Sequence, residues 1–332
     1  MPTHPVSFRI LSSVDVRVDA SSVLKVAAPG QRALLAQLLV NANQTVRAST
    51  LIDGIWGGAP PQRPESALHI VVCRLRRALD VVAPRLVRDG TGYRIELDPD
   101  ELDLTRAQAY EANARRVIQD GDPARAAAIY DAALTCWTGE PLADLANFPF
   151  YEATARQLRE LRFGIIEARN VAYLRCGRHL DVLKDVDSWI QTEPWRERLR
   201  AHQMVALYRS GRQIESLSVY EDLRRLLVTD FGVDPHEDIQ RLHGRILRRD
   251  PRLLDDRGDT QSRVQDTLVD RLREIALDGE GVVVVEGGPG VDKTWLVAEL
   301  PNRPRDDATG REIDLRSTPR RVSLSDWLAT TR

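Results

Sequence analysis

Residues Pro64–Arg94, PESALHIVVCRLRRALDVVAPRLVRDGTGYR, form the most informative stretch of this sequence. At about 100° per residue, a helix over 64–80 gathers its apolar side chains on one side and leaves polar and cationic ones on the other. The apolar stripe consists of Leu68, Val71, Val72, Leu75 and Leu79. Opposite it lie Ser66, Ile70, Cys73 and Arg77, with Arg74 to one side and Arg76 to the other. The stretch predicts a helix with one packed face and one cationic face, followed by a glycine-turned hairpin.

The residues upstream supply the rest of a small domain. Residues 6–19 alternate apolar and polar side chains as short strands do, and Gln31–Val40 reads as a helix with a buried leucine face. A second helix, TLIDGIW, is predicted to be N-capped by Ser49 and to end at the glycines and prolines of 57–61. Strands, three helices and a hairpin make a winged helix-turn-helix, in which the last helix enters the DNA major groove and the hairpin braces against the backbone.

The distribution of charge agrees with this prediction. The whole chain has a formal net charge of −2, but residues 1–98 contain 12 Lys and Arg against 8 Asp and Glu. The remaining residues contain 35 against 41. A basic first domain, which the neutral total conceals, is typical of a phosphate-binding protein.

Residues 6–97 also resemble the DNA-binding domain of the OmpR/PhoB class of response regulators. The resemblance lies in Ile55-Trp56 after the second helix, in Arg74-Leu75-Arg76-Arg77, and in the wing signature Gly90–Arg94. The receiver domain that usually precedes it, with its phosphorylatable Asp, is not found here, so we expect activation to come from elsewhere.

The resemblance implies roles for individual residues. Base edges are expected to be read by Ala67, Ile70 and Arg74. Phosphates are expected to be contacted or braced by Ser66, Arg76, Trp56 and Tyr93. The chemistry agrees, because an arginine such as Arg74 binds guanine through two hydrogen bonds, Ile70 suits a thymine methyl, and Arg77 neutralises phosphate. Asp89 is a poor wing tip for the minor groove, so we expect Arg88 to take that place. The alternative is that the arginines form only a solvated helix edge.

Composition limits the other possibilities. Hydrophobic residues make up 42% and charged residues 29% of the chain, as in soluble globular proteins. The N-terminus lacks the apolar run of a signal peptide or membrane helix, so we expect a cytoplasmic, nucleoid-associated protein without a membrane partner. The three cysteines are far apart and expected to be reduced, and the six histidines lack metal-ligand spacing, so no metal site is expected.

The middle of the chain carries a helical repeat. The glycines Gly121, Gly177 and Gly211 each separate two amphipathic helices, and the last two are 34 residues apart, which is the tetratricopeptide period. Tyr130 and Tyr220 both lie nine residues after their glycine. The longer first interval requires an insertion, predicted at TGEPLADLANFPF.

Residues from about 100 to 250 resemble the bacterial transcriptional activator domain. The resemblance lies in residues 133–142, 193–197, 206–213 and 232–235. A winged helix followed by this domain is similar to the Streptomyces antibiotic regulatory protein (SARP) family. That resemblance implies activation of secondary-metabolite genes through head-to-tail binding to promoter direct repeats and recruitment of RNA polymerase holoenzyme. A repeat domain that only rigidifies or dimerises the protein is the alternative.

The C-terminal segment contains a degenerate phosphate loop. A strand over 281–286 leads to Gly287, Gly290, Lys293 and Thr294, which resembles the start of an NB-ARC nucleotide-binding domain. Asp292 replaces the glycine that the motif requires, and its carboxylate would repel phosphate. We therefore expect no cofactor, although ATP with Mg²⁺ remains the alternative.

Together these features predict a mainly α-helical chain with a small α+β N-terminal domain. The predicted segments are a winged helix over 1–98, a tetratricopeptide-like activator domain over 99–250, a linker over 251–263 and a short α/β phosphate-loop segment over 264–332. The predicted function is a non-enzymatic, sequence-specific transcriptional activator of antibiotic biosynthesis. An ATP-dependent switch with a DNA-binding output, or a repressor, is the alternative.

Overall fold

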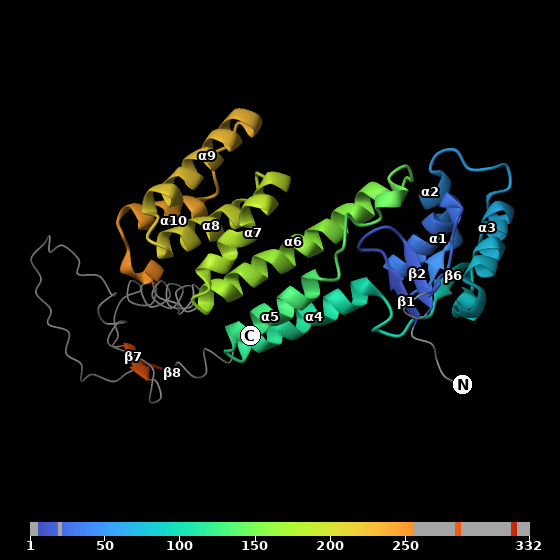
Figure 1. Cartoon of the computed structure of the whole chain (residues 1–332), viewed down its shortest axis with the longest axis horizontal. Helices are drawn as coiled ribbons and strands as arrows, with labels where there is room; N and C mark the ends of the chain where they lie inside the picture. The colour runs from blue at the N-terminus through green and yellow to red at the C-terminus, as the bar shows by residue number, and fades with distance from the viewer. Residues whose placement is uncertain (1–5, 19–21, 255–282, 287–319, 324–332) are drawn as a thin grey trace, which may run out of the picture. The chain divides into compact units, whose positions relative to one another are not determined.

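A computed structural model describes residues 6–18, 22–254, 283–286 and 320–323 of the chain. The chain divides into two units between Asp256 and Arg257. The first unit contains both a winged helix and a helical repeat domain (Figure 1). The predicted fold class, mainly α-helical with a small α+β N-terminal part, is confirmed.

The winged helix has the predicted order of strands, three helices and hairpin. A first antiparallel sheet joins β1 (Val6–Arg9), β2 (Asp15–Val18) and β3 (Ser22–Val23). The helices α1 (Pro29–Val40), α2 (Ala48–Trp56) and α3 (Pro64–Leu79) follow, with β4 (Val46–Arg47) before α2. A 3-10 turn, η1 (Asp80–Arg85), leads from α3 into the wing, where β5 (Leu86–Asp89) and β6 (Gly92–Ile95) pair and β4 adds to the far side of β6.

Two positions of the wing require glycine, each for a different steric reason. Gly90 follows β5 with φ of +55°, in the left-handed region that favours glycine. Gly92 has no such φ, but a Cβ atom there would lie 2.2 Å from the carbonyl oxygen of Val46. The sequence GTG therefore supplies one glycine for the turn and one for the close pairing of β6 with β4.

The predicted N-cap of α2 is wrong. The helix begins at Ala48, which places Ser49 inside its first turn. The reason is that Val46 and Arg47 pair with Tyr93 and Gly92 of the wing, so the chain passes directly from strand β4 into the helix.

The helical repeat domain is built from antiparallel helix pairs. These are α4 (Asp103–Gln119) with α5 (Pro123–Leu134), α6 (Tyr151–Arg175) with α7 (His179–Thr192), and α8 (Glu197–Arg209) with α9 (Gln213–Phe231). A short turn, η2 (Ala143–Leu145), precedes α6, and α10 (Glu237–Leu247) with η3 (Pro251–Leu254) ends the unit.

The repeat predicted from the glycine spacing is present. Gly121, Gly177 and Gly211 each adopt a positive φ, between +73° and +87°, in the turn between paired helices. The residue nine positions later is buried in each second helix: Tyr130, Val186 and Tyr220. The longer first interval has two sources, because α6 has 25 residues and α8 has 13, and the predicted insertion lies ahead of α6.

The beginning of the predicted linker belongs to the helical domain. Residues 251–254 form η3, in which Leu253 is buried. The carbonyl of Leu253 accepts a hydrogen bond from Arg209 Nε at 2.8 Å, and Arg245 pairs with Asp250 at 2.9 Å. Charge and proline content suggested a linker here, but one leucine and one carbonyl attach the segment to α8.

In the second unit, β7 (Val283–Glu286) pairs in parallel with β8 (Arg320–Ser323). Of the strand predicted over 281–286, the described part, 283–286, is a strand. The phosphate-loop residues Gly287, Gly290, Lys293 and Thr294, and Asp292 among them, lie outside the described residues.

The winged helix and the repeat domain share one hydrophobic core, which runs from Val6 to Ala206. At their junction the carboxylate of Asp103, 1% exposed, accepts backbone N–H bonds from Ile10, Leu11 and Leu104 at 2.8 to 3.0 Å. Burial raises the pKa of this carboxyl, and the three N–H donors oppose that rise. Phe8 adds a backbone hydrogen bond to Glu101, at 2.6 Å.

Replacing Asp103 with alanine should destabilise the first unit by about 2–4 kcal/mol, because buried N–H groups would be left without an acceptor. Chemical denaturation measures the loss. Asp100→Ala, at an exposed position in the turn just before α4, is the matched control and should change stability by less than about 0.5 kcal/mol. Similar losses of unfolding free energy in both variants would show that the buried carboxylate acceptor does not stabilise the junction.

Candidate nucleic-acid interface

Helix α3 packs on one side and exposes the other, as its sequence predicts. Leu68, Val72, Leu75 and Leu79 are buried and hold it against α1 and α2. Ser66, Ile70, Arg74 and Arg77 are exposed. Ile70 keeps 51% of its surface accessible. The exposed face thus combines two cations with one apolar side chain.

Arg76 lies differently from its neighbours. Its Nε and Nη2 donate hydrogen bonds to the carbonyl of Leu86, at 3.1 and 2.7 Å. Leu86 is the first residue of the wing strand β5, so Arg76 fixes the wing to the end of α3. The phosphate contact of Arg76 stays a prediction. In the structure its guanidinium binds a carbonyl group of the protein itself.

The wing tip also differs in charge from what its sequence suggests. The carboxylate of Asp89 accepts hydrogen bonds from Thr45 Oγ1 and from Arg94 Nη1, the latter at 2.8 Å. Arg94 thereby offsets the negative charge that makes Asp89 unsuited to DNA. Arg88 is exposed beside it, and its minor-groove contact stays a prediction.

The other predicted contact residues are less accessible. Trp56, the last residue of α2, and Ala67 on α3 are half-buried. Tyr93 is 6% exposed, so most of its ring belongs to the core under the wing. The phosphate contacts predicted for Trp56 and Tyr93 stay predictions.

Further exposed residues lie at the N-termini of α2 and α3 and on α3 itself. Arg47 and Arg63 are exposed immediately before α2 and α3. His69 is exposed and lies 3.5 Å from the Sγ atom of Cys73, one helical turn along α3. A search for cations at the N-termini of the two helices would have found the arginines, because helix N-termini favour phosphate.

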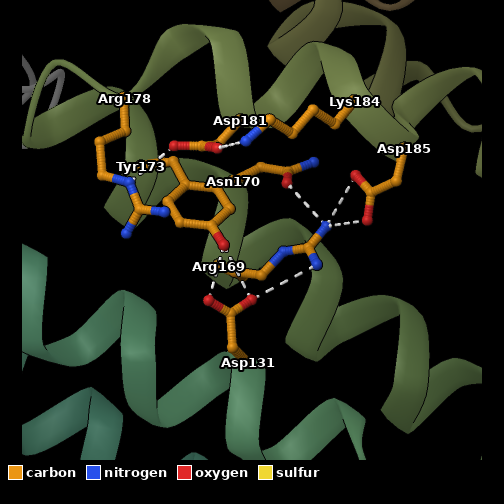
Figure 2. A network of polar contacts seen from close by, with 8 residues as sticks. All are labelled: Asp131, Arg169, Asn170, Tyr173, Arg178, Asp181, Lys184 and Asp185. Atoms are coloured by element: carbon orange, nitrogen blue, oxygen red, sulfur yellow. Dashed lines mark hydrogen bonds and ion pairs between the residues drawn. The ribbon is translucent and has the colours of Figure 1, made fainter.

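A second group of ionisable residues joins helices α5, α6 and α7 (Figure 2). The guanidinium of Arg169, 7% exposed, lies between Asp185 at 2.7 Å and Asp131 at 3.6 Å. The Tyr173 hydroxyl donates to Asp131, and burial with this bond raises the pKa of Tyr173. Because opposite charges are paired across three helices, we assign this network to fixing the packing of the first two repeats.

Other kinds of site find no support in the part of the chain that the structure describes. Within it, no three His, Cys, Asp or Glu side chains cluster as metal ligands would. None of the helices described is both long and apolar enough to cross a bilayer.

Comparison with known proteins matches both parts of the first unit. Residues 26–95 match the family described as transcriptional regulatory protein, C terminal, and residues 102–247 match the bacterial transcriptional activator domain. The chain is 39% identical over 233 residues to the regulatory protein AfsR of Streptomyces griseus, covering 70% of this chain and 24% of AfsR. It therefore spans about a quarter of the length of that relative.

Shorter relatives are covered more completely. The regulatory protein DnrI of Streptomyces peucetius is 31% identical over 229 residues, or 66% of this chain and 84% of DnrI. The solved structure of Mycobacterium tuberculosis EmbR in complex with a low-affinity phosphopeptide superposes with a TM-score of 0.73 at 29% identity, covering 80% of this chain and 71% of EmbR. With both domains matched in order, the chain belongs to the Streptomyces antibiotic regulatory protein family of transcriptional regulators.

Proposed function

We propose that this chain is a sequence-specific DNA-binding activator of secondary-metabolite genes that binds promoter direct repeats and recruits RNA polymerase holoenzyme. The observation that carries the proposal is the face of α3, where Ile70, Arg74 and Arg77 are exposed while Arg76 is held by the wing. A helix with this face suits the major groove, where arginine reads guanine and an aliphatic side chain contacts the thymine methyl. The proposal includes no enzymatic activity and no cofactor.

The contacts between the repeat domain and the winged helix favour activation over repression by simple occupancy of DNA. The segment ahead of α6 binds the winged helix at several points, because Asp144 pairs with Arg32 at 2.8 Å and accepts the N–H of Val14 at 3.0 Å. The Leu142 N–H donates to the carbonyl of Ser12 at 2.7 Å. The repeat domain is thus held at a fixed place relative to α3, where it can present a surface to a protein bound at the same promoter.

Arg74 and Arg77 should contribute to binding in different ways. We expect Arg74→Ala to weaken binding by about 1–3 kcal/mol and to relax specificity at one base pair. Arg77→Ala should weaken binding to all sequences alike and reduce the salt dependence by about one phosphate contact. Binding to a panel of single-base variants at several salt concentrations separates the two. Equal, sequence-independent losses would contradict the assignment.

The protein should be monomeric alone and bind DNA as a head-to-tail pair. Direct repeats about 10–10.5 bp apart place two recognition helices on the same face of the duplex. Light scattering with and without DNA, and binding to direct or inverted repeats of equal spacing, measure this. A stable dimer without DNA, or a preference for inverted repeats, would contradict a head-to-tail pair.

Residues 1–256 should suffice for DNA binding and activation. The end point keeps η3, because buried Leu253 belongs to the repeat domain. Promoter assays compare the full chain with 1–256.

Asp292 should also prevent a nucleotide response, so ATP with Mg²⁺ should change neither DNA affinity nor thermal stability in the full chain or in Lys293→Ala. Lost activation in 1–256, or an ATP effect that Lys293→Ala removes, would favour the nucleotide switch.

A further inference from the structure

The tip of the wing carries an arginine and an aspartate in succession, on opposite faces of its sheet. Arg88 of β5 lies opposite Tyr93 of β6, and Asp89 lies opposite Gly92. Successive residues of a strand alternate between the two faces, and Tyr93 is buried. Arg88 therefore shares the inner face with the Tyr93 ring but is exposed, on the edge strand of the sheet. Asp89 lies on the outer face.

The carboxylate of Asp89 joins all three parts of this sheet. It accepts a hydrogen bond from Thr45 Oγ1, just before β4, and another from Arg94 Nη1 of the middle strand β6, the latter at 2.8 Å. A Cβ atom at Gly92, between them, would lie 3.1 Å from the Thr45 side chain. The absence of a side chain at Gly92 thus leaves room for Thr45 to reach Asp89 across β6.

The wing tip is attached to the start of α2 as well. The N–H of Ala48, the first residue of α2, donates to the carbonyl of Thr91 at 3.1 Å, in the turn between β5 and β6. The guanidinium of Arg88 differs, because no other side chain or carbonyl of the described residues binds it. The backbone that carries Arg88 is therefore fixed while its guanidinium is available to DNA.

Charge alone would give Asp89 the opposite effect on DNA binding. Arg47 and Arg94 lie on its face of the sheet, and a second carboxylate, Glu96, pairs with Arg94 at 2.7 Å. Removing either carboxylate makes the sheet more positive, which by electrostatics alone should strengthen binding to DNA phosphate. The two carboxylates differ in geometry, because Asp89 is also bonded to Thr45.

We infer that Asp89 is a positioning residue for DNA binding, whose bonds to Thr45 and Arg94 hold the neighbouring Arg88 where it contacts the duplex. The inference rests on the proposed function, under which the wing lies against DNA. A side chain on a fixed backbone loses less conformational entropy when it binds than one on a mobile loop. This gain outweighs the repulsion between the Asp89 carboxylate and phosphate.

The test measures the affinity of full-chain variants for a duplex that the unaltered chain selects from random-sequence DNA, at several salt concentrations. Asp89→Ala removes the carboxylate, and Thr45→Val removes one of its bonds without a change of charge. Glu96→Ala is the matched control, because it removes the other carboxylate bound to Arg94. Arg88→Ala, alone and combined with Asp89→Ala, measures whether Asp89 acts through Arg88.

We expect Asp89→Ala and Thr45→Val each to weaken binding by about threefold to tenfold and to reduce its salt dependence. Glu96→Ala should bind within about twofold of the unaltered chain or more tightly. In the Arg88→Ala background, Asp89→Ala should cause no further loss of affinity. Thermal unfolding checks the fold of each variant, and if Asp89→Ala lowers the Tm, Thr45→Val, which keeps the ion pair, decides the question.

Unchanged or tighter binding by Asp89→Ala and Thr45→Val would overturn the inference, and so would a loss that persists in the Arg88→Ala background. Unaltered affinity of Arg88→Ala would also overturn it and leave the proposed function standing. If the unaltered chain selected no DNA sequence, the proposed function itself would be overturned.

Discussion

The contact on which the first unit most depends is the buried carboxylate of Asp103. A charged group at 1% exposure is costly unless hydrogen bonds compensate it, and here the backbone N–H groups of Ile10, Leu11 and Leu104 do so. Two of those donors belong to the winged helix and one to α4. The carboxylate therefore satisfies the chain after strand β1 and the first turn of the repeat domain together, and the winged helix loses both of its bonds if the two parts separate.

Contacts between the two domains extend to the turn of the helix-turn-helix. Pro149, just before α6, lies so close to Gly57 at the end of α2 that a Cβ atom at Gly57 would be 2.9 Å from it. Gly57 begins the connection from α2 to α3, so the activator domain supports the turn of the helix-turn-helix directly.

The arginines of α3 show how one sequence motif divides into different roles. Arg74 and Arg77 are exposed to solvent, while Arg76 donates hydrogen bonds to the Leu86 carbonyl and holds the wing. Asp89, which appears in the sequence as a repulsive charge at the wing tip, is offset by Arg94 in the adjacent strand. The role of Arg76 follows from the wing lying against the end of α3, and the Asp89–Arg94 pair follows from the pairing of β5 with β6.

Periodicity and turn chemistry in the sequence predicted much of this protein. The apolar stripe of α3, the strand order of the winged helix and the glycine turns of the repeat all depend on neighbours within a few residues, where side-chain spacing and φ preferences act. Only the tertiary structure decided the start of α2 at Ala48, the inward role of Arg76 and the attachment of Leu253 to the repeat domain. Those outcomes depend on partners distant in sequence: Tyr93 beside Val46, Leu86 beside Arg76, and Arg209 beside Leu253. The same holds for Asp103, whose acceptor role exists only because folding brings Ile10 and Leu11 to it across more than 90 residues of chain.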